Sequence, residues 1–245
     1  MTKTLTEGNP AKLILFFSLP LIIGNIFQQF YSMADTLIVG RTIGVNALAA
    51  VGCTGSITFL ILGFVQGLTS GLSIITSQKF GAKNEDDVRK SFAASILISS
   101  AVAIITTILS VLLARPLLEL LQTPSEIIDD AWAYLVIIFL GIPATVLFNL
   151  LSNAVRALGD SKTPLYFLIF ACCINIILDL VFILYFHLGV VGAGIATILS
   201  QLLSGILCIF FIIKKVPILR LKKTDFQMHY EVITSHLSIA LPMAF

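Results

Sequence analysis

The sequence predicts an all-α integral membrane protein, a six-helix transmembrane lobe, from its composition and its long uncharged runs. Of the 245 residues, 58% are hydrophobic and only 11% are charged, and the mean hydropathy is +1.03. Soluble domains typically carry about 25% charged residues. A helix of roughly 20 apolar residues crosses a bilayer, and open sheet cannot satisfy its backbone in lipid. We predict spans at 13–36, 46–77, 91–114, 131–155, 164–186 and 190–213.

The basic residues predict how these spans are oriented. The polar segment before the first span has no small-residue cleavage site, so we interpret it as a cytoplasmic tail and not a signal peptide. With that tail inside, thirteen of the fifteen Lys and Arg residues are cytoplasmic, and only Arg41 and Arg115 lie outside. This bias follows the positive-inside rule. We expect a multi-pass protein of a bacterial plasma membrane with a cytoplasmic N-terminus.

The second run is longer than one span needs. Splitting it in two would place Arg41 and the basic cluster at 79–90 on the same side, so the charge bias favours one long helix with a Gly-rich lead-in.

The four cysteines all lie in apolar runs without metal-ligand spacing. They are best interpreted as small membrane-embedded hydrophobic residues.

Two acids, Asp35 and Asp179, interrupt otherwise uncharged spans. An acid inside a span costs about 2.5–3.5 kcal/mol on insertion scales, so such residues usually face a polar interior and bind ions or substrate. At about 1.5 Å per residue, Asp35, Asp179 and Thr197 each fall about 8–12 Å from the outer end of their spans. Three polar residues from three helices are thus expected at one depth.

The spacing within each span predicts which polar residues share a helix face. Asn175 and Asp179 are four residues apart, as are Thr197 and Gln201. Carboxylate, amide and hydroxyl oxygens would suit a small cation such as sodium, whereas two close carboxylates could instead share a proton. The residues alone leave both possibilities open. A stripe on the first span adds Gly24, Gln28, Tyr31 and Asp35 to this set.

Each of these residues also has a simpler interpretation. Asp35 would mark only the outer end of its helix, and Asn175 would make only a hydrogen bond between helices. Thr197 alone is ordinary in a span.

Pro20, in the middle of the first span, removes one backbone hydrogen bond and predicts a bend, which is either static or moves during transport.

The end of the sequence suggests an internal repeat. After residue 213 comes a basic, polar stretch, and a new apolar run opens at 236. The segment at 236–245, HLSIALPMAF, is similar in sequence to ILFFSLPLII at 14–23, with Pro242 aligned on Pro20. Internal repeats are common in secondary transporters, although a chance Leu-Pro match is the alternative. We predict a lobe at 1–213, a cytoplasmic linker at 214–235 and the start of a second lobe at 236–245.

Five segments, in order and at matching spacing, resemble the multidrug and toxic compound extrusion (MATE) family. They are SLPLIIGNIFQQFYSMAD at 18–35, GVNALAAVG at 44–52, SQKFGAKN at 77–84, RALGDSKTP at 156–164 and GAGIATILSQ at 192–201. The resemblance implies half of a twelve-helix, two-lobe transporter, with the N-terminal lobe and the start of the seventh helix present. It also implies export of amphipathic, often cationic organic compounds in exchange for sodium or protons by alternating access.

The family's cation site implies roles for particular residues. Its pattern matches Asp35, Asn175, Asp179 and Thr197, which would hold sodium or a proton. Tyr134, Asn149 and Asn153 resemble further polar lining of the lobe, together with Gln28 and Tyr31 of the first span. The implied partners are membrane lipid, small amphipathic substrates and a second six-helix lobe, and we expect no nucleic acid and no cofactor beyond the coupling ion.

Two other functions stay open at this stage. A lipid-linked precursor flippase of the wider superfamily would place Arg or Lys in its cavity, and no predicted span contains one. A non-transporting membrane subunit would tolerate Asp179→Asn. We do not expect an enzyme, because no Ser/His/Asp set, metal motif or phosphate loop is present. His187, His229 and His236 are interpreted as interfacial residues.

Overall fold

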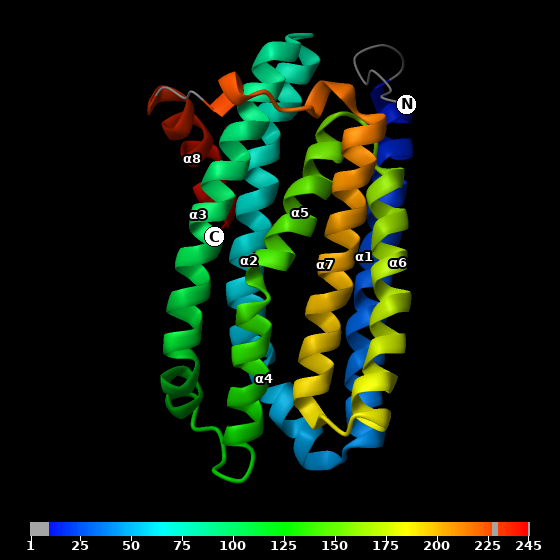
Figure 1. Cartoon of the computed structure of the whole chain (residues 1–245), viewed down its shortest axis with the longest axis vertical. Helices are drawn as coiled ribbons and strands as arrows, with labels where there is room; N and C mark the ends of the chain where they lie inside the picture. Colours follow the sequence, from blue (N-terminus) through cyan, green and yellow to red (C-terminus); the bar gives the residue numbers. More distant parts are fainter. Residues whose placement is uncertain (1–9, 227–229, 245) are drawn as a thin grey trace.

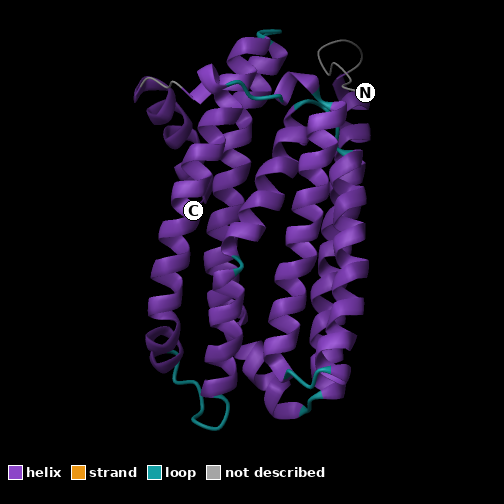
Figure 2. Cartoon of the chain, viewed as in Figure 1, coloured by secondary structure: helices purple, strands orange, loops and turns teal. Residues whose placement is uncertain are grey.

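The structure is a bundle of long helices joined by short turns (Figures 1 and 2). This computed structural model describes residues 10–226 and 230–244, so residues 1–9 of the predicted N-terminal tail and His229 lie outside the described residues. No strand occurs in the described part of the chain, which confirms the all-α prediction. The α-helices are α1 (Pro10–Thr42), α2 (Val45–Gly81), α3 (Glu85–Leu120), α4 (Ile128–Leu140), α5 (Ile142–Ala157), α6 (Lys162–Leu180), α7 (Gly189–Lys215) and α8 (Tyr230–Ala244).

Three short segments complete the secondary structure. A π-helical turn, η1 (Val181–Tyr185), follows α6 directly. Two 3-10 turns, η2 (Pro217–Leu219) and η3 (Lys223–Phe226), lie between α7 and α8. α8 begins earlier than the predicted apolar run at 236, because the helix continues back through polar residues.

Five helices are each long and apolar enough to cross a membrane among the described residues, and α4 with α5 form a sixth span if the bent pair is counted as one. The sequence predicted 131–155 as a single span, whereas the structure bends it by 44° at Gly141. Pro143 explains the break, because it has no N–H to donate to the preceding turn. The second predicted span is one unbroken helix, as the charge bias indicated.

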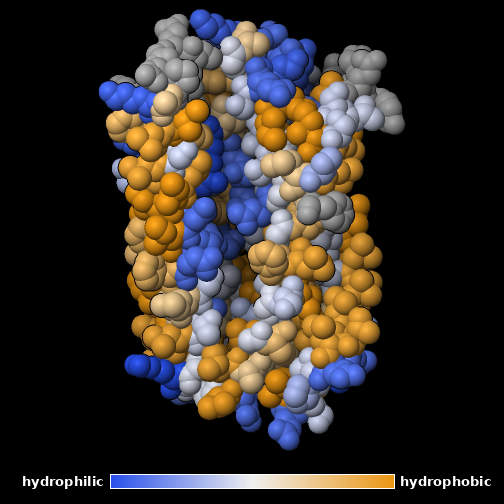
Figure 3. Space-filling view, turned by 180° about the vertical axis from the view of Figure 1, so that it is seen from behind, coloured by the Kyte–Doolittle hydropathy of each residue, from blue (hydrophilic) through white to orange (hydrophobic). Residues whose placement is uncertain are grey.

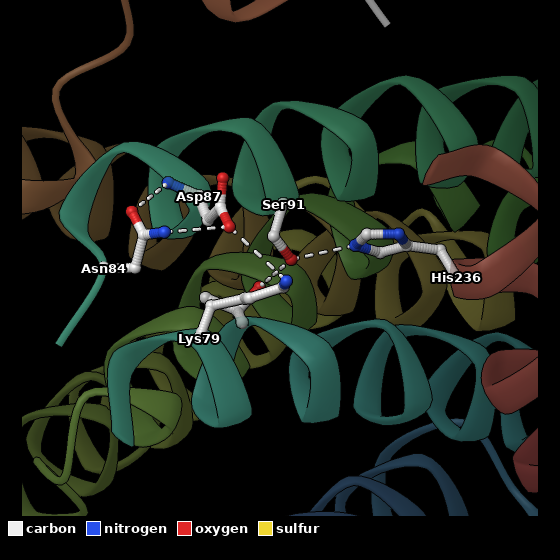
Figure 4. Close-up of polar contacts among 6 residues, drawn as sticks. Lys79, Asn84, Asp87, Ser91 and His236 are labelled. Carbon is white, nitrogen blue, oxygen red and sulfur yellow. Dashed lines mark hydrogen bonds and ion pairs between the residues drawn. The ribbon is translucent and has the colours of Figure 1, made fainter. Parts of the chain in front are cut away.

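α2 and α3 extend beyond their predicted ends into a capped turn. The side chain of Asn84 accepts a hydrogen bond from the backbone N–H of Asp87 at 3.2 Å, and Lys79 lies 3.4 Å from the Asp87 carboxylate (Figure 4). Three acids in the first turn of α3 complement its helix dipole. This polar turn lies at the predicted cytoplasmic end of the bundle.

The helices pack in two sets that α4 and α5 connect. α2 packs against α3, α4, α5 and α8, whereas α1 packs mainly against α6, and α7 packs against α4, α5 and α6. In Figure 1, α1 and α2 lie behind α3, α5 and α7. The backbones of α3 and α7 do not approach each other closely in the described structure, and the tilted α5 lies between them. This arrangement places two different faces on the lobe, one formed by α1 and α2 and one by α3, α5 and α7.

α8 is fixed to α2 and α3 by a buried chain of hydrogen bonds. Nδ1 of His236 lies 2.7 Å from the carbonyl of Val232, so Nδ1 carries the proton in the neutral ring. Nε2 then accepts from the Ser91 hydroxyl at 2.8 Å (Figure 4), and Ser91 accepts from Thr76 at 3.0 Å. His236 is 2% exposed. The prediction of an interfacial His236 is therefore wrong, because the packing of α8 buries this side chain against α2 and α3.

Two glycines on α2 allow this close approach. A Cβ on Gly71 would lie 2.6 Å from Cα of Ala240, and a Cβ on Gly67 would meet the carbonyl oxygen of Met243. A Cβ on Gly63, one turn earlier on α2, would meet nothing within 4 Å. The close packing of α8 on α2 thus requires glycine, with no side chain, at positions 67 and 71 of α2.

We expect Gly71→Ala to lower the thermal stability of the purified protein, because the added methyl group overpacks a backbone contact, at a cost of about 1–3 kcal/mol. Gly63→Ala is the matched control and should leave the melting temperature unchanged or raise it. Equal melting temperatures for the two variants would contradict the close packing of α8 on α2.

Candidate functional site

A cavity of about 370 Å³ lies where α1, α2, α4 and α7 meet. Its polar lining includes several of the residues singled out in the sequence. Asp35 reaches it from α1 and is 7% exposed, and Thr197 reaches it from α7. Apolar side chains such as Phe59 and Ile138 complete the wall. The predicted residues found in this lining are Gln28, Tyr31, Asp35, Tyr134 and Thr197.

Asp179 of α6 lies behind this lining, next to Asp35 of α1. Asp179 is fully buried. Both of its carboxyl oxygens, and Oδ1 of Asp35, find no hydrogen-bond donor within the part of the chain that the structure describes. Unpartnered buried carboxylate oxygens are costly, so this pair requires a positive ion or a proton.

Asn175 completes the buried part of the site. Its Nδ2 donates to Oγ1 of Thr197 at 3.4 Å, and its Oδ1 has no partner among the described residues. The hydroxyl of Tyr31 lies beside Thr197 and Ser200. Neither Asn175 nor Asp179 belongs to the cavity lining. A cation entering from the cavity would therefore first meet Asp35 and Thr197.

Local features of the chain bring these helices together. Asn175 and Asp179 share a face because they lie one turn apart on α6, and the π-helical turn η1 begins two residues after Asp179. Such turns occur frequently at functional sites. On α7, a Cβ on Gly192 would lie 3.1 Å from Cβ of Phe182 in η1, and one on Gly194 would lie 2.9 Å from Cγ2 of Ile137. Small residues at such positions let the helix backbones approach each other closely.

A smaller cavity of about 110 Å³ adjoins the first and shares Gln28, Tyr31 and Gln201 with it. Asn149 lines this second cavity. Asn153 does not line either cavity. Asn153 is buried against α2, and its Nδ2 donates to Oγ1 of Thr69 at 3.5 Å. Its Oδ1 accepts a hydrogen bond from Arg156 at 3.2 Å.

Hydroxyl groups of α2 also line the main cavity, and sequence reasoning missed them. Thr54 and Thr58 face it, next to Gly52 and Gly55. The available signal was the small and polar segment GCTGS at 52–56 inside an otherwise apolar span. Figure 3 shows a hydrophilic band along the middle of the rear face, between two apolar margins. The cavity thus belongs to a polar face, and not to a lipid-facing one.

α1 continues through Pro20, which is buried, without a break in its helix. The moving bend at this residue stays a prediction.

The oxygen ligands at this site suit a hard monovalent cation or a proton. No group of three or more His, Cys, Asp or Glu residues that could hold a metal ion occurs in the described ranges. The unpartnered oxygens of Asp35, Asn175 and Asp179, together with the Thr197 hydroxyl, provide an oxygen-rich environment from three helices. A cation bound there would neutralise the two like charges.

A multi-pass helical lobe with buried acids beside a polar cavity is the architecture of a membrane transporter. The sequence matches the MatE family over residues 20–181, and the chain belongs to this family.

Individual relatives agree with this assignment. The chain is 38% identical over 216 residues to the probable multidrug resistance protein YpnP of Bacillus subtilis, covering 85% of this chain and 47% of that protein. It is 30% identical over 233 residues to the probable multidrug resistance protein YoeA of the same organism, covering 92% of this chain and 50% of the relative. The chain therefore spans about half the length of the curated relatives it matches.

Solved structures show the same correspondence. A structure of a MOP superfamily transporter from Pyrococcus furiosus superimposes with a TM-score of 0.91 at 26% identity, and its description reports a reversed polarity of the binding pocket that suggests a different function. The superposition covers 98% of this chain and 53% of that one. The chain thus corresponds to one lobe of a two-lobe transporter.

We expect Thr197→Val to destabilise the protein by about 1 kcal/mol, because the buried Asn175 amide loses its acceptor. Thr107→Val is the matched control on α3, since the Thr107 hydroxyl is buried without a partner within the described structure. Thermal unfolding of both purified variants checks the expectation. A Thr107→Val variant as destabilised as Thr197→Val would contradict this role of Thr197.

Proposed function

We propose that this chain is one lobe of a secondary active antiporter that exports amphipathic, often cationic organic compounds in exchange for sodium or protons. The observation that carries the proposal is the pair of buried acids, Asp35 and Asp179, placed beside a cavity of about 370 Å³. The family membership and the names of the relatives support export as the direction of transport.

The cavity composition supports the class of substrate. Phe59, Leu62 and Ile138 provide apolar contact area, and Asp35 provides a negative charge at the same wall. An amphipathic cation matches both features, since its apolar body packs against the side chains and its charge is attracted to the carboxylate. Gln28 and Gln201 add hydrogen-bonding groups that adapt to different substrates.

Coupling follows if the exported compound and the coupling ion compete for the same carboxylates. Sodium or a proton bound at Asp35 and Asp179 neutralises the charge that attracts the substrate. Each ligand would therefore favour a different state of the lobe, which is the condition for alternating access. The second lobe supplies the other wall of the pathway, and the N-terminus lies in the cytoplasm as the distribution of basic residues indicates.

Efflux of ethidium tests the proposal in cells that express the complete reading frame. We expect Asp179→Asn to reduce efflux by at least tenfold at equal expression, because the buried site loses one of its two negative charges. Asp130→Asn is the matched control. Asp130 is an exposed acid at the start of α4, and its loss should leave efflux unchanged.

Assays with and without added sodium, at constant pH and ionic strength, separate the two coupling ions. Efflux that depends on sodium identifies a sodium antiporter, whereas efflux that depends only on the pH gradient identifies a proton antiporter. Wild-type efflux equal to that of Asp179→Asn, with both above cells that carry an empty vector, would contradict the role of the buried acids. Wild-type efflux no greater than that of such cells would contradict export of this class of compound.

A further inference from the structure

Another cavity, larger than the polar one, lies on the face away from the polar site. It has a volume of about 630 Å³ and is formed by α3, α5, α7 and the segment after η2. α5 forms its floor, because its backbone packs closely against both α3 and α7, whereas the backbones of these two helices do not approach each other closely in the described structure. The bend of 44° at Gly141 tilts α5 and so opens this groove. Figure 1 shows α3, α5 and α7 in front of α1 and α2.

The groove is apolar along most of its length. Leu150 and Leu151 of α5 and Ile212 of α7 are buried in it, whereas Ile104 and Ile213 at its edges are 59% and 54% exposed. Exposed isoleucines on a membrane-spanning helix face lipid tails. The groove is therefore open to the hydrocarbon of the bilayer.

Its length matches one leaflet of a membrane. The lining residues of α3 run from Phe92 to Ile104, which is about 18 Å along the helix axis at about 1.5 Å per residue. The hydrocarbon core of a bilayer is about 30 Å thick, so one leaflet spans about 15 Å. A single extended acyl chain would fit along the groove.

The guanidinium group of Arg220 provides a positive charge at one end of the groove. Arg220 lines it, and its Nε donates to the carbonyl of Ile213 at 2.8 Å, which holds the side chain near the end of α7. Arg220 forms no ion pair with a carboxylate in the described parts of the chain. The neighbouring basic residues are Lys214, Lys215, Lys222 and Lys223.

Asp225, two residues after Lys223, lies 3.6 Å from Nε of Arg89, to which it is paired. Among the described side chains, therefore, no carboxylate pairs with the Arg220 guanidinium at the end of the groove. A phosphate group would complement it, and anionic lipids attract basic residues at the membrane surface.

We propose that this groove is a binding site for an anionic phospholipid, with one acyl chain along α5 and the phosphate at Arg220. The proposal does not depend on the transport activity, because it concerns the opposite face of the lobe. Its consequence is that a bound lipid fills the space between α3 and α7, which no side chain of the described structure occupies. The lipid would thereby support the tilted α5.

Native mass spectrometry of the purified, delipidated full chain tests this site. Phosphatidylglycerol and phosphatidylcholine with identical acyl chains are added in equal amounts. We expect one phosphatidylglycerol to bind in preference to phosphatidylcholine. Arg220→Gln should reduce its binding roughly fivefold, the factor for one basic residue near an anionic lipid surface. Lys222→Gln, a change two residues away and outside the groove lining, should have a smaller effect.

A second pair of variants tests the acyl chain. Ile104→Trp places an indole in the groove, whereas Ile105→Trp alters a neighbouring residue of similar exposure, 57%, that does not line it. We expect only Ile104→Trp to weaken binding of both lipids. Equal losses for Arg220→Gln and Lys222→Gln would overturn the proposal in favour of a diffuse basic surface. Equal binding by the two tryptophan variants would also overturn it.

Discussion

The strongest physical constraint on the structure is a pair of carboxylates that lie next to each other inside an apolar bundle. Asp179 is fully buried and Asp35 nearly so, and three of their four oxygens lack a donor within the described residues. Such a pair is unfavourable without a positive charge between the carboxylates. The bundle tolerates it because Thr197, Asn175 and a polar cavity surround it, so a small cation or a proton would lower the energy of the whole arrangement. The buried pair therefore has a structural cost, and under the proposed function ion binding would offset it.

Departures from regular helix geometry position the two faces of the lobe. The π-helical turn η1 after Asp179 and the small residues Gly192 and Gly194 bring α7 close to its neighbours at the level of the acids. The break at Gly141 tilts α5 and opens the apolar groove on the other side. Gly71 and the buried His236 attach α8 to the lobe. The regular parts of the helices are long and apolar enough to cross a membrane, and the irregular parts shape the two cavities.

The long membrane helices and the shared face of Asn175 and Asp179 could be predicted, because both follow from local rules. Long uncharged runs specify membrane helices, and a spacing of four residues places Asn175 beside Asp179. The bend at Gly141 was not predicted, since a Gly and a nearby Pro within an apolar run are also compatible with one straight span. The hydroxyls of Thr54 and Thr58 and the burial of His236 depend on which helices pack together, which a single sequence does not specify. The role of the acids in cation binding stays a proposal.

Infrared difference spectroscopy of the purified protein would test the central claim most directly. The carboxyl bands would be compared between sodium and choline solutions at constant pH, and between two pH values without sodium, in wild type and Asp179→Asn. The account predicts a carboxyl band that responds to sodium or to pH and is absent from the Asp179→Asn difference spectrum. Identical difference spectra for wild type and Asp179→Asn under both comparisons would contradict it, because the buried acids would then bind neither ion.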